Sequence, residues 1–493
     1  MSNLTALSLE LITALAALLF LIADAMLPKE KRGYLGYGCI AFLGLLMFGA
    51  LTMGGPETLS AFGGRIVLDP LALFFKQLSI AIVFLVALLS VDVMKKLPDG
   101  HGEFYPILLF ILTGMMLLAG ATEFVTIFIA IELISIPSYV LAGYHKHVFK
   151  SSEAGMKYFI LGAFSSALLL YGMSLVYGAT GSTQLSEIST ALQKLPLESP
   201  VSSGFGALLF VGLVLMMAGF GFKIAAVPFH LWAPDVYEGA PSPVTAFLSV
   251  GPKAAGIAVI IRVFLLFLEP IQHHWAHLFV ILAALSMVLG NLLAIPQRNL
   301  KRMLAYSGIA QIGYVLVGLV AATNLESPGG TAQLGISSAM FYMAAYVATN
   351  LAAFSVVVVF SCLLGKEEIS DLKGLSRLYP GISFCMLIAL LSLAGVPPLA
   401  GFMGKFYLFS AAWSAGFHWL VGLGVLCSVI SLYYYFMVIR TMYFEESPIE
   451  LKLSLTWPQK LALGVTTLSI LFIGIYPSCI STVTLEAARL FLP

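Results

Sequence analysis

The amino-acid sequence predicts an all-α polytopic membrane protein. Of its 493 residues, 60% are hydrophobic and only 10% are charged, and the mean hydropathy is +0.99. A soluble domain carries about 25% charged residues, so this composition cannot supply an ordinary water-exposed surface. The apolar residues also gather into runs of about 20 residues, the length that a spanning helix needs, with short polar stretches between them. We therefore expect a single membrane domain.

The composition also argues against several other classes of protein. The formal net charge is +1 and the charges form no basic face, so nothing indicates a nucleic-acid partner. The five cysteines lie mostly in apolar segments without a C-x-x-C pair, so we expect neither a disulfide framework nor a metal site. There is no glycine-rich phosphate loop and no haem attachment motif, and we expect no cofactor in this chain. The first apolar run lacks a basic n-region and a cleavage site, which indicates a retained helix.

Runs of this length predict about fourteen spans. They lie near residues 5–27, 34–53, 71–92, 104–121, 123–143, 155–179, 205–231, 242–268, 275–295, 301–322, 332–364, 383–412, 417–440 and 459–485. We divide the domain (1–493) into helices 1–3 in 1–103, a first repeat of helices 4–8 in 104–268, a second repeat of helices 9–13 in 275–440, and helix 14 in 459–485.

Three spans contain internal proline or glycine. Pro228 removes a backbone donor and is expected to break the seventh span, and Pro397-Pro398 the twelfth. Gly251-Pro252 is expected to act in the same way in the eighth span. Breaks at membrane depth persist only where they line a cavity or are buried in protein, so they indicate a conducting path.

A weak internal repeat accompanies these breaks. The segment IELISIPSYVLAG (131–143) resembles YSGIAQIGYVLVG (306–318), and AAVPFHL (225–231) resembles AGVPPLA (394–400). Each pair joins helices that are five apart in order, and because five is odd the two copies run in opposite directions through the membrane. Inverted repeats with paired broken helices are typical of transporters. When Pro228 is aligned on Pro397, Lys223 falls on Ser392 and not on Lys405, so the halves are not copies at residue level.

Basic residues give the orientation, because cytoplasmic loops are rich in lysine and arginine. One set of alternate loops holds Lys29, Lys31, Arg32, Lys95, Lys96, Lys146, Lys150, Lys157, Arg298, Lys301, Arg302, Lys366, Lys373, Arg377, Arg440, Lys452 and Lys460. The opposite set holds Arg65, Lys194 and Arg489. We therefore expect both termini on the non-cytoplasmic side of a bacterial inner membrane.

Four ionisable residues are predicted near the middle of the membrane: Glu132, Lys223, Lys253 and Lys405. A lysine at the bilayer centre costs at least about 2.5 kcal/mol, so it is seldom present without a function. A structural ion pair between Glu132 and Lys223 is the alternative, but it leaves Lys253 and Lys405 without acidic partners. We interpret the four as a proton relay. Lysine suits this role because its charge responds to burial and to a neighbouring carboxylate, whereas arginine does not deprotonate in proteins.

Further polar residues are candidate members of the relay: His230, Ser307, Gln311, Tyr342, Tyr346 and Asn350. For each, the alternative is a structural hydrogen bond between helices. Asp235 and Glu238 follow in the next loop, where they either solvate the loop or collect protons. Lys76 and Arg262 are expected to snorkel to the outer interface as structural residues, and Glu10 and Asp24 to lie at interfaces.

With these residues in place, the chain resembles the antiporter-like membrane subunits of respiratory complex I, the proton-pumping NADH:quinone oxidoreductase, and most closely the subunit N (NuoN) type. VPFHLWAPDVYEGAPSPVTAFLSVGPKAA (227–255), NLKRMLAYSGIAQIGY (299–314) and AGVPPLAGFMGKFYLF (394–409) carry the resemblance, which spans the whole length.

The resemblance implies fourteen helices, two inverted five-helix repeats and broken helices 7 and 12. It implies a relay that matches Glu132, Lys223, Lys253 and Lys405. The subunit M type carries glutamate at the position of Lys405, so the lysine here argues against that type. The subunit L type differs by a long C-terminal amphipathic helix. NADH, FMN, iron–sulfur clusters and quinone are then held by partner subunits, and the partners are a neighbouring antiporter-like subunit, small membrane subunits and lipid.

Two other functions remain open from sequence. A subunit of a multi-subunit Mrp-type cation/proton antiporter would share ancestry and most of these motifs. A structural spacer that fastens helices of a larger complex would conduct nothing, although intramembrane lysines without partners count against it.

Overall fold

We describe a computed structural model of the chain over residues 2–53, 58–96, 102–194, 204–323, 331–446 and 455–491. Lys452, which belongs to the orientation argument, lies outside these residues. The elements are α1 (Ser2–Ala6), α2 (Ser8–Met26), η1 (Lys29–Lys31), α3 (Gly33–Thr52), β1 (Leu59–Ala61), β2 (Ile66–Leu68), α4 (Pro70–Lys95), α5 (Phe104–Gly120), α6 (Phe124–Ala142), α7 (Phe149–Thr180), α8 (Leu185–Lys194), α9 (Gly204–Ile224), α10 (Trp232–Gly239), α11 (Ser242–Ile260), η2 (Ile261–Phe267), η3 (Glu269–Ile271), α12 (Gln272–Ala294), α13 (Leu300–Ala321), α14 (Ala332–Leu364), η4 (Ile369–Leu372), α15 (Leu375–Leu378), α16 (Pro380–Ala394), α17 (Ala400–Ser414), α18 (His418–Phe444), α19 (Trp457–Ile475), α20 (Ser478–Ala487) and η5 (Ala488–Phe491).

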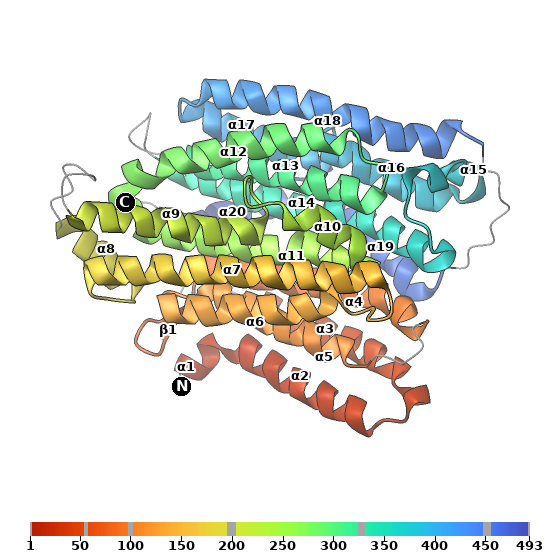
Figure 1. Ribbon diagram of the computed structural model, residues 1–493, viewed down its shortest axis with the longest axis horizontal. Coiled ribbons are helices and arrows are strands. Elements are labelled where there is room, and N and C mark those ends of the chain that lie inside the picture. Colours follow the sequence, from red (N-terminus) through yellow and green to blue (C-terminus); the bar gives the residue numbers. More distant parts are fainter. Residues whose placement is uncertain are drawn as a thin grey trace.

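The helices lie side by side with roughly parallel axes, α2 on one flank and α18 on the other (Figure 1). Within the described residues, 12 helices are long and apolar enough to cross a membrane, and α5 and α16 are shorter apolar helices. The protein is therefore a multi-pass membrane protein. The predicted spans overlap these helices, although the spans predicted at 383–412 and 459–485 each cover two helices.

Helices end before two of the three sites at which a break is predicted, and one helix continues through the third. α9 ends at Ile224 and α16 ends at Ala394, so the chain leaves helical geometry before Pro228 and Pro397. α11, in contrast, continues through Pro252 to Ile260. Pro252 has no N–H to offer the carbonyl of Leu248, and the hydroxyl of Tyr237 donates to that oxygen instead, at 3.0 Å. The expectation of a break at Gly251-Pro252 was wrong, because a neighbouring side chain satisfies the freed carbonyl.

Both helix ends are closed by the same pattern of hydrogen bonds. After α9, the N–H of Ala226 bonds to the carbonyl of Gly221 at 2.9 Å, and Ala225 has a φ of 58°. After α16, the N–H of Val396 bonds to the carbonyl of Leu391 at 3.0 Å, and Gly395 has a φ of 90°. A residue of positive φ followed by a backward-reaching N–H is a common helix C-cap.

The two ends of the bundle differ in their loops. The β1–β2 hairpin, which pairs Leu59 with Leu68, lies with α8 and both termini at one end, called here the hairpin end (Figure 1). At the other end, which carries α15 and is called the basic end, a bridge joins Asn299 to Glu368. The basic residues of the described loops follow this division, with Arg65 and Lys194 at the hairpin end.

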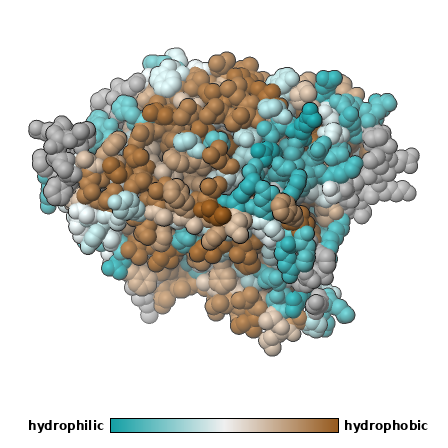
Figure 2. Space-filling view, in the orientation of Figure 1, coloured by the Kyte–Doolittle hydropathy of each residue, from teal (hydrophilic) through white to brown (hydrophobic). Residues whose placement is uncertain are grey.

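The interior is formed by α11, α13 and α14. In the hydrophobic windows of these helices, 89%, 94% and 100% of the residues are buried, whereas in α7 and α18 only 39% are. Apolar side chains of the outer helices face outward, and Figure 2 shows them as a broad hydrophobic surface with a hydrophilic area toward the basic end. Buried polar residues therefore lie where three helices are enclosed on all sides by other helices.

Candidate functional site

The first cluster of the site lies between α6, α7 and α9. Nζ of Lys223 donates to Oγ of Ser135 at 2.6 Å, and Oγ of Ser166 donates to Oε1 of Glu132 at 2.5 Å. The ammonium of Lys223 also lies 5.9 Å from the ring centroid of Tyr139. No ion pair within 4.0 Å joins Glu132 to Lys223, both of which lie in the described part of the chain. Each charge is held by a serine, which leaves both able to exchange a proton with a new neighbour.

Lys253 forms the second cluster, between α11, α13 and α14. Its side chain is 1% exposed, and within the described residues its Nζ has no hydrogen-bond partner. The rings of Tyr237 and Tyr346 lie 5.7 Å and 5.9 Å from the ammonium. Gly308 faces them from α13: a Cβ there would lie 2.8 Å from Nζ of Lys253 and 2.9 Å from the hydroxyl of Tyr346. Glycine is needed at this position to let the lysine reach α13.

Lys405 forms the third cluster at the end of α16. Its Nζ donates to the carbonyl of Leu393 at 3.0 Å and to that of Ala394 at 3.1 Å. The last carbonyls of a helix have no partner within the helix and carry partial negative charge, so an ammonium there is favourable. The ring of Tyr314 lies beneath the ammonium, with its centroid 4.5 Å away. Lys405 thus caps the end of α16 and, within the described residues, has no carboxylate partner.

A chain of hydroxyl and amide groups extends from Lys405 toward Lys253. Nε2 of Gln311 donates to the carbonyl of Leu393, which it shares with Lys405, and to the hydroxyl of Tyr435 at 3.3 Å. That hydroxyl is hydrogen-bonded to Oγ of Ser307 at 2.5 Å, and the hydroxyl of Tyr342 donates to Oε1 of Gln311. Ser307 precedes Gly308, which contacts Lys253 and Tyr346. The structure therefore brings Ser307, Gln311, Tyr342 and Tyr346 together between the two lysines.

The first two clusters meet at the helix α11. A Cβ on Gly256 would lie 3.8 Å from Cβ of Lys223, so the backbones of α9 and α11 approach closely beside the first lysine. Lys253 lies three residues before Gly256, on the neighbouring turn of α11. His230 is buried as well, but its side chain makes no hydrogen bond to any of the four charged residues within the described part of the chain. Its membership of the relay remains a prediction.

One cavity is lined by Lys405, and a second cavity shares two serines with the first. A groove of about 480 Å³ between α17 and α18 has Lys405, Ser410 and Ser414 in its wall. A second cavity of about 200 Å³, near the hairpin end, contains Ser337, Ser338 and Ser481 and shares Ser410 and Ser414 with the first. Hydroxyl groups therefore extend from beside Lys405 toward the end of the bundle at which both termini lie.

Asp235 and Glu238 form an ion-pair network around α10. Asp235 pairs with Lys157 at 2.8 Å and Arg302 at 2.6 Å, and Glu238 pairs with Lys150 at 3.1 Å and Arg302 at 3.3 Å. Burial raises the pKa of the Asp235 carboxyl, but its hydrogen bonds from Lys157 and Arg302 outweigh this and hold the pKa below its ordinary value. Asp235 is thus a poor collector of protons and fastens α10 to α7 and α13.

Lys76 and Arg262 do not snorkel. Lys76 is fully buried and pairs with Glu10 at 2.7 Å, so Glu10 does not face the interface either. Arg262 is 1% exposed and donates through both terminal nitrogens to Asp69, at 2.8 Å and 2.9 Å. Snorkelling was the wrong expectation, because a carboxylate from another segment lies within reach of each cation. Asp24 pairs with Arg32 at 3.5 Å, at the end of α2 that adjoins the basic end.

Sequence reasoning missed Ser135, Ser166, Ser249 and Tyr435. Ser135 follows Glu132 by three residues, a spacing that places both on one helix face and could have indicated it. Ser166 and Tyr435 come from distant helices, and Tyr435 stands in a run of three tyrosines that also suits a membrane interface. The described residues contain no group of three or more His, Cys, Asp or Glu side chains able to hold a metal ion.

Comparisons with known proteins bear on this geometry. Residues 121–431 match the family described as "NADH:quinone oxidoreductase/Mrp antiporter, TM". The chain is 44% identical to NADH-quinone oxidoreductase subunit N of Trichlorobacter lovleyi, over 99% of this chain and 97% of that one. It is 42% identical to the subunit of that name in Moorella thermoacetica, over 100% and 99%.

Solved structures agree. A chain of respiratory complex I from Thermus thermophilus has a TM-score of 0.79 and 30% identity, covering 96% of this chain and 98% of that one. A chain of the Mrp complex from Dietzia sp. DQ12-45-1b has a TM-score of 0.83 at 18% identity, covering 98% and 97%, which shows a shared fold only. From the matched segment, the near full-length identity and the shared fold, we conclude that the chain belongs to the NADH:quinone oxidoreductase/Mrp antiporter family of transmembrane proteins, among the N subunits of NADH-quinone oxidoreductases.

Proposed function

We propose that this chain is a proton-translocating subunit of the membrane arm of an NADH:quinone oxidoreductase, and that Glu132, Lys223, Lys253 and Lys405 carry the protons. The observation that supports the relay most strongly is the row of buried ammonium groups without acidic partners. Lys253 has no hydrogen-bond partner within the described residues, and Lys405 is held by carbonyl oxygens alone. Buried cations of this kind are costly and mark ion pathways in membrane proteins.

The proton would move by a change of electrostatic neighbours. While the charge of Glu132 is uncompensated, it favours the ammonium form of Lys223. When the charge of Glu132 is neutralised, burial favours the amine, and Lys223 releases its proton toward Lys253 across the contact between α9 and α11. The groups from Ser307 to Gln311 then extend the path to Lys405, since each can accept and donate a hydrogen bond.

For the architecture we propose fourteen spans, in which α9 with α10 forms a broken helix 7 and α16 with α17 a broken helix 12. The repeats of 104–268 and 275–440 are then inverted copies. The matching helix ends support this, and they pair Ala225 with Gly395, one residue away from the alignment that the prolines suggested. In this register Lys223 corresponds to Leu393, whose carbonyl accepts from Lys405. The two halves are again unlike at residue level.

We further propose that the basic end faces the cytoplasm and both termini lie outside it. The described loops of the basic end hold most of the lysine and arginine, as cytoplasmic loops do. Protons leaving Lys405 would then follow the serines of the two cavities to the opposite face. NADH oxidation, flavin, iron–sulfur clusters and quinone reduction belong to partner subunits, which include a neighbouring antiporter-like subunit and small membrane subunits.

The test is Lys223→Ala in the intact complex, measured in inverted membrane vesicles energised with NADH. We expect proton transfer, followed by quenching of a ΔpH-sensitive dye, to fall severalfold while native electrophoresis shows the complex assembled. Lys223→Arg should fail equally, because arginine keeps the charge but does not give up its proton. Lys150→Ala, an exposed pair partner, is the matched control and should pump normally. Loss of assembly in Lys223→Ala would count for the structural-spacer function and against the relay.

A further inference from the structure

A row of buried polar groups extends along α11, beside α14, from the basic end to Lys253. On α11 it consists of Ser242, Thr245, Ser249 and Lys253, spaced by three and four residues and 6%, 0%, 1% and 1% exposed. This spacing places them on one face of the helix. A hydrophobic span ordinarily presents apolar side chains to its neighbours. A polar face on the enclosed helix α11 is costly and therefore indicates a function.

α14 supplies hydrogen-bond partners for Ser242 and Ser249, whereas Thr245 donates to backbone carbonyls just before α11. Oγ of Ser361 donates to Oγ of Ser242 at 2.7 Å, near the basic end. Deeper in the bundle, Nδ2 of Asn350 donates to Oγ of Ser249 at 2.7 Å. The hydroxyl of Tyr346 donates to the carbonyl of Ser249 at 3.0 Å. We call these residues of α11 and α14 the seam.

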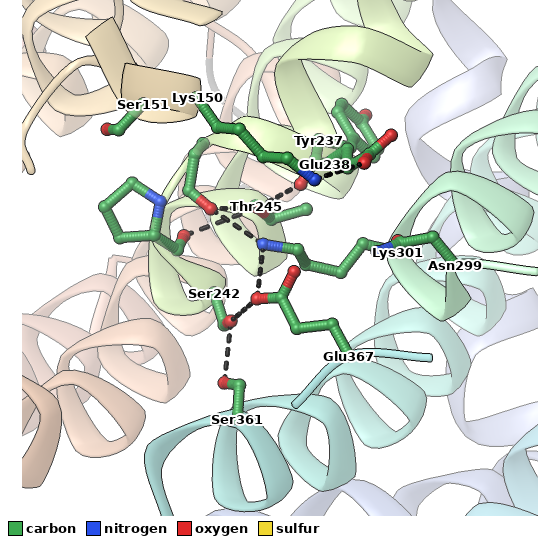
Figure 3. Close-up of polar contacts among 12 residues, drawn as sticks. Lys150, Ser151, Tyr237, Glu238, Ser242, Thr245, Asn299, Lys301, Ser361 and Glu367 are labelled. Atoms are coloured by element: carbon green, nitrogen blue, oxygen red, sulfur yellow. Dashed lines mark hydrogen bonds and ion pairs between the residues drawn. The ribbon is translucent and has the colours of Figure 1, made fainter. Parts of the chain in front are cut away.

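The seam is closed at the basic end by one ion pair (Figure 3). Nζ of Lys301 lies 2.7 Å from Oε1 of Glu367 and donates to the carbonyl of Ala240 at 2.9 Å. The same Oε1 accepts from Oγ of Ser242 at 3.3 Å. The side chain of Lys301 is 2% exposed and that of Glu367 is 28% exposed, so the carboxylate is the member that reaches water. The pair therefore stands between the solvent and the first hydroxyl of the seam.

The deep end of the seam holds two polar atoms that lack partners. Nζ of Lys253 and Oδ1 of Asn350 are buried and, within the described residues, make no hydrogen bond. Unsatisfied buried polar groups are expensive, and sites of this kind are where ordered water is found. The seam thus extends from the partly exposed carboxylate of Glu367 to the unpaired polar atoms of Lys253 and Asn350, where an ordered water molecule would find hydrogen-bond partners.

We propose that the seam is a second proton route, which supplies Lys253 directly from the basic end, and that Lys301 and Glu367 are its gate. This inference rests on the relay proposed above. Glu367 takes a proton from hydronium at the surface and becomes neutral, so its attraction for Lys301 falls and the pair separates. The acid then donates to Ser242, the hydroxyl chain and water pass one proton along, and the amine of Lys253 receives it. Glu367 returns to the carboxylate, and one proton has moved inward.

Charges around the gate allow this separation. Lys150 and Glu238 lie nearby and pair with each other at 3.1 Å (Figure 3). Lys366, the residue before Glu367 in the chain, pairs with Asp371 at 3.3 Å. Neither of these pairs supplies a second cation for Glu367. Asp235, by comparison, is held by two cations and stays fixed. Glu367 is therefore held by one cation among the described residues, and one proton suffices to release it.

The gate is tested by access of a reagent to Ser249→Cys, in an intact complex in which the five native cysteines of this chain are replaced. Inverted vesicles expose the basic end, and a small cationic thiosulfonate is added without NADH, so no turnover is involved. Glu367→Gln mimics the protonated acid and keeps a group for Ser242 to bond. We expect Glu367→Gln to raise the rate at which the cysteine is labelled by about tenfold. Lys301→Met should raise the rate by a similar factor, because it removes the other member of the ion pair. Lys366→Gln, which breaks the adjacent exposed pair, should leave the rate unchanged. Equal labelling in all backgrounds would overturn the gate.

The route is tested separately by Ser242→Ala, which removes the hydroxyl next to the gate. NADH-driven proton transfer should fall severalfold, while the labelling of Ser249→Cys does not decrease. The control is Ser355→Ala, because Ser355 is equally buried on α14 but bonds only to the carbonyl of Leu351. Normal pumping in Ser242→Ala would exclude the seam as a route. These results are distinguishable from failure of the relay, because labelling needs no turnover and Lys223→Ala leaves the seam intact.

Discussion

At the scale of single residues, the three lysines of the proposed relay are stabilised in three different ways. Lys223 rests on a serine hydroxyl, Lys405 on the carbonyls at a helix end, and Lys253 on aromatic rings without a hydrogen bond among the described residues. An ammonium near an aromatic face gains about 0.5–2 kcal/mol, less than a paired charge. Lys253 is therefore the least secured of the three, and small changes around it should have the largest effect.

Gly308 gives a direct test of that statement. Gly308→Ala would place a methyl group 2.8 Å from Nζ of Lys253 and 2.9 Å from the hydroxyl of Tyr346, so one of the two must move. We expect proton transfer in inverted vesicles to drop severalfold with assembly retained. Gly422→Ala is the control, since a Cβ there has nothing within 4 Å. If both variants pump alike, Lys253 does not depend on its contact with α13.

Tyr435 is the residue that joins Ser307 to Gln311. Tyr435→Phe removes the hydroxyl and two hydrogen bonds, each contributing about 1 kcal/mol to stability. We expect slower NADH-driven proton transfer and little loss of assembled complex. Ser355→Ala removes one buried hydroxyl, which donates to the carbonyl of Leu351 outside this chain of groups, and serves as the comparison. Similar rates in the two variants would place Tyr435 among purely structural residues.

At the scale of elements, ion pairs hold the short helix α10 in position. It follows the break after α9, and Asp235 and Glu238 bind it to α7 and α13 through Lys157, Lys150 and Arg302. Surface ion pairs contribute little individually, but Arg302 joins two carboxylates in one network. These ion pairs fasten α10 next to the non-helical residues that separate it from α9.

The pKa of Asp235 predicts how this fastening depends on pH. Because that pKa is lowered in the folded protein, the stability it contributes is fully present above about pH 4, the unfolded value, and is lost as the pH falls through the folded value. The Tm of the complex should therefore exceed that of Asp235→Asn by a constant amount at neutral pH, and the difference should shrink only below about pH 4. A difference that shrinks between pH 7 and 5 would show that Asp235 titrates as a proton collector.

At the scale of the whole molecule, spans and charged positions could be predicted from sequence, whereas partners could not. Hydropathy located the helices because a helix that crosses the hydrocarbon region needs a long run of apolar residues. It also placed Glu132 and the lysines at depth, since charge is conspicuous within such runs. Hydropathy carries no information on which buried groups touch. The bonds of Lys223 to Ser135 and of Tyr237 to Leu248 depend on tertiary packing, and so does the pairing of Arg262 with Asp69.

Orientation can be measured across the whole molecule with a membrane-impermeant maleimide. Lys373→Cys, at the basic end, should be labelled in inverted vesicles and protected in whole cells. Arg65→Cys, whose position is 60% exposed in the hairpin, should show the reverse. The reason is the excess of lysine and arginine in loops of the basic end. Labelling of both positions from one side would refute the proposed topology.

The enclosure of α14 has a consequence for how the protein is made. This helix packs against α4, which is synthesised early, and against α19 and α20, which are synthesised last. When α14 leaves the ribosome, part of its eventual surroundings does not yet exist, and its serine, asparagine and tyrosine side chains face lipid or the insertion machinery. Completion of the bundle therefore waits for the C-terminal helices. A nascent chain stopped before α19 would present this polar helix to the bilayer, as a signal that membrane quality control can recognise.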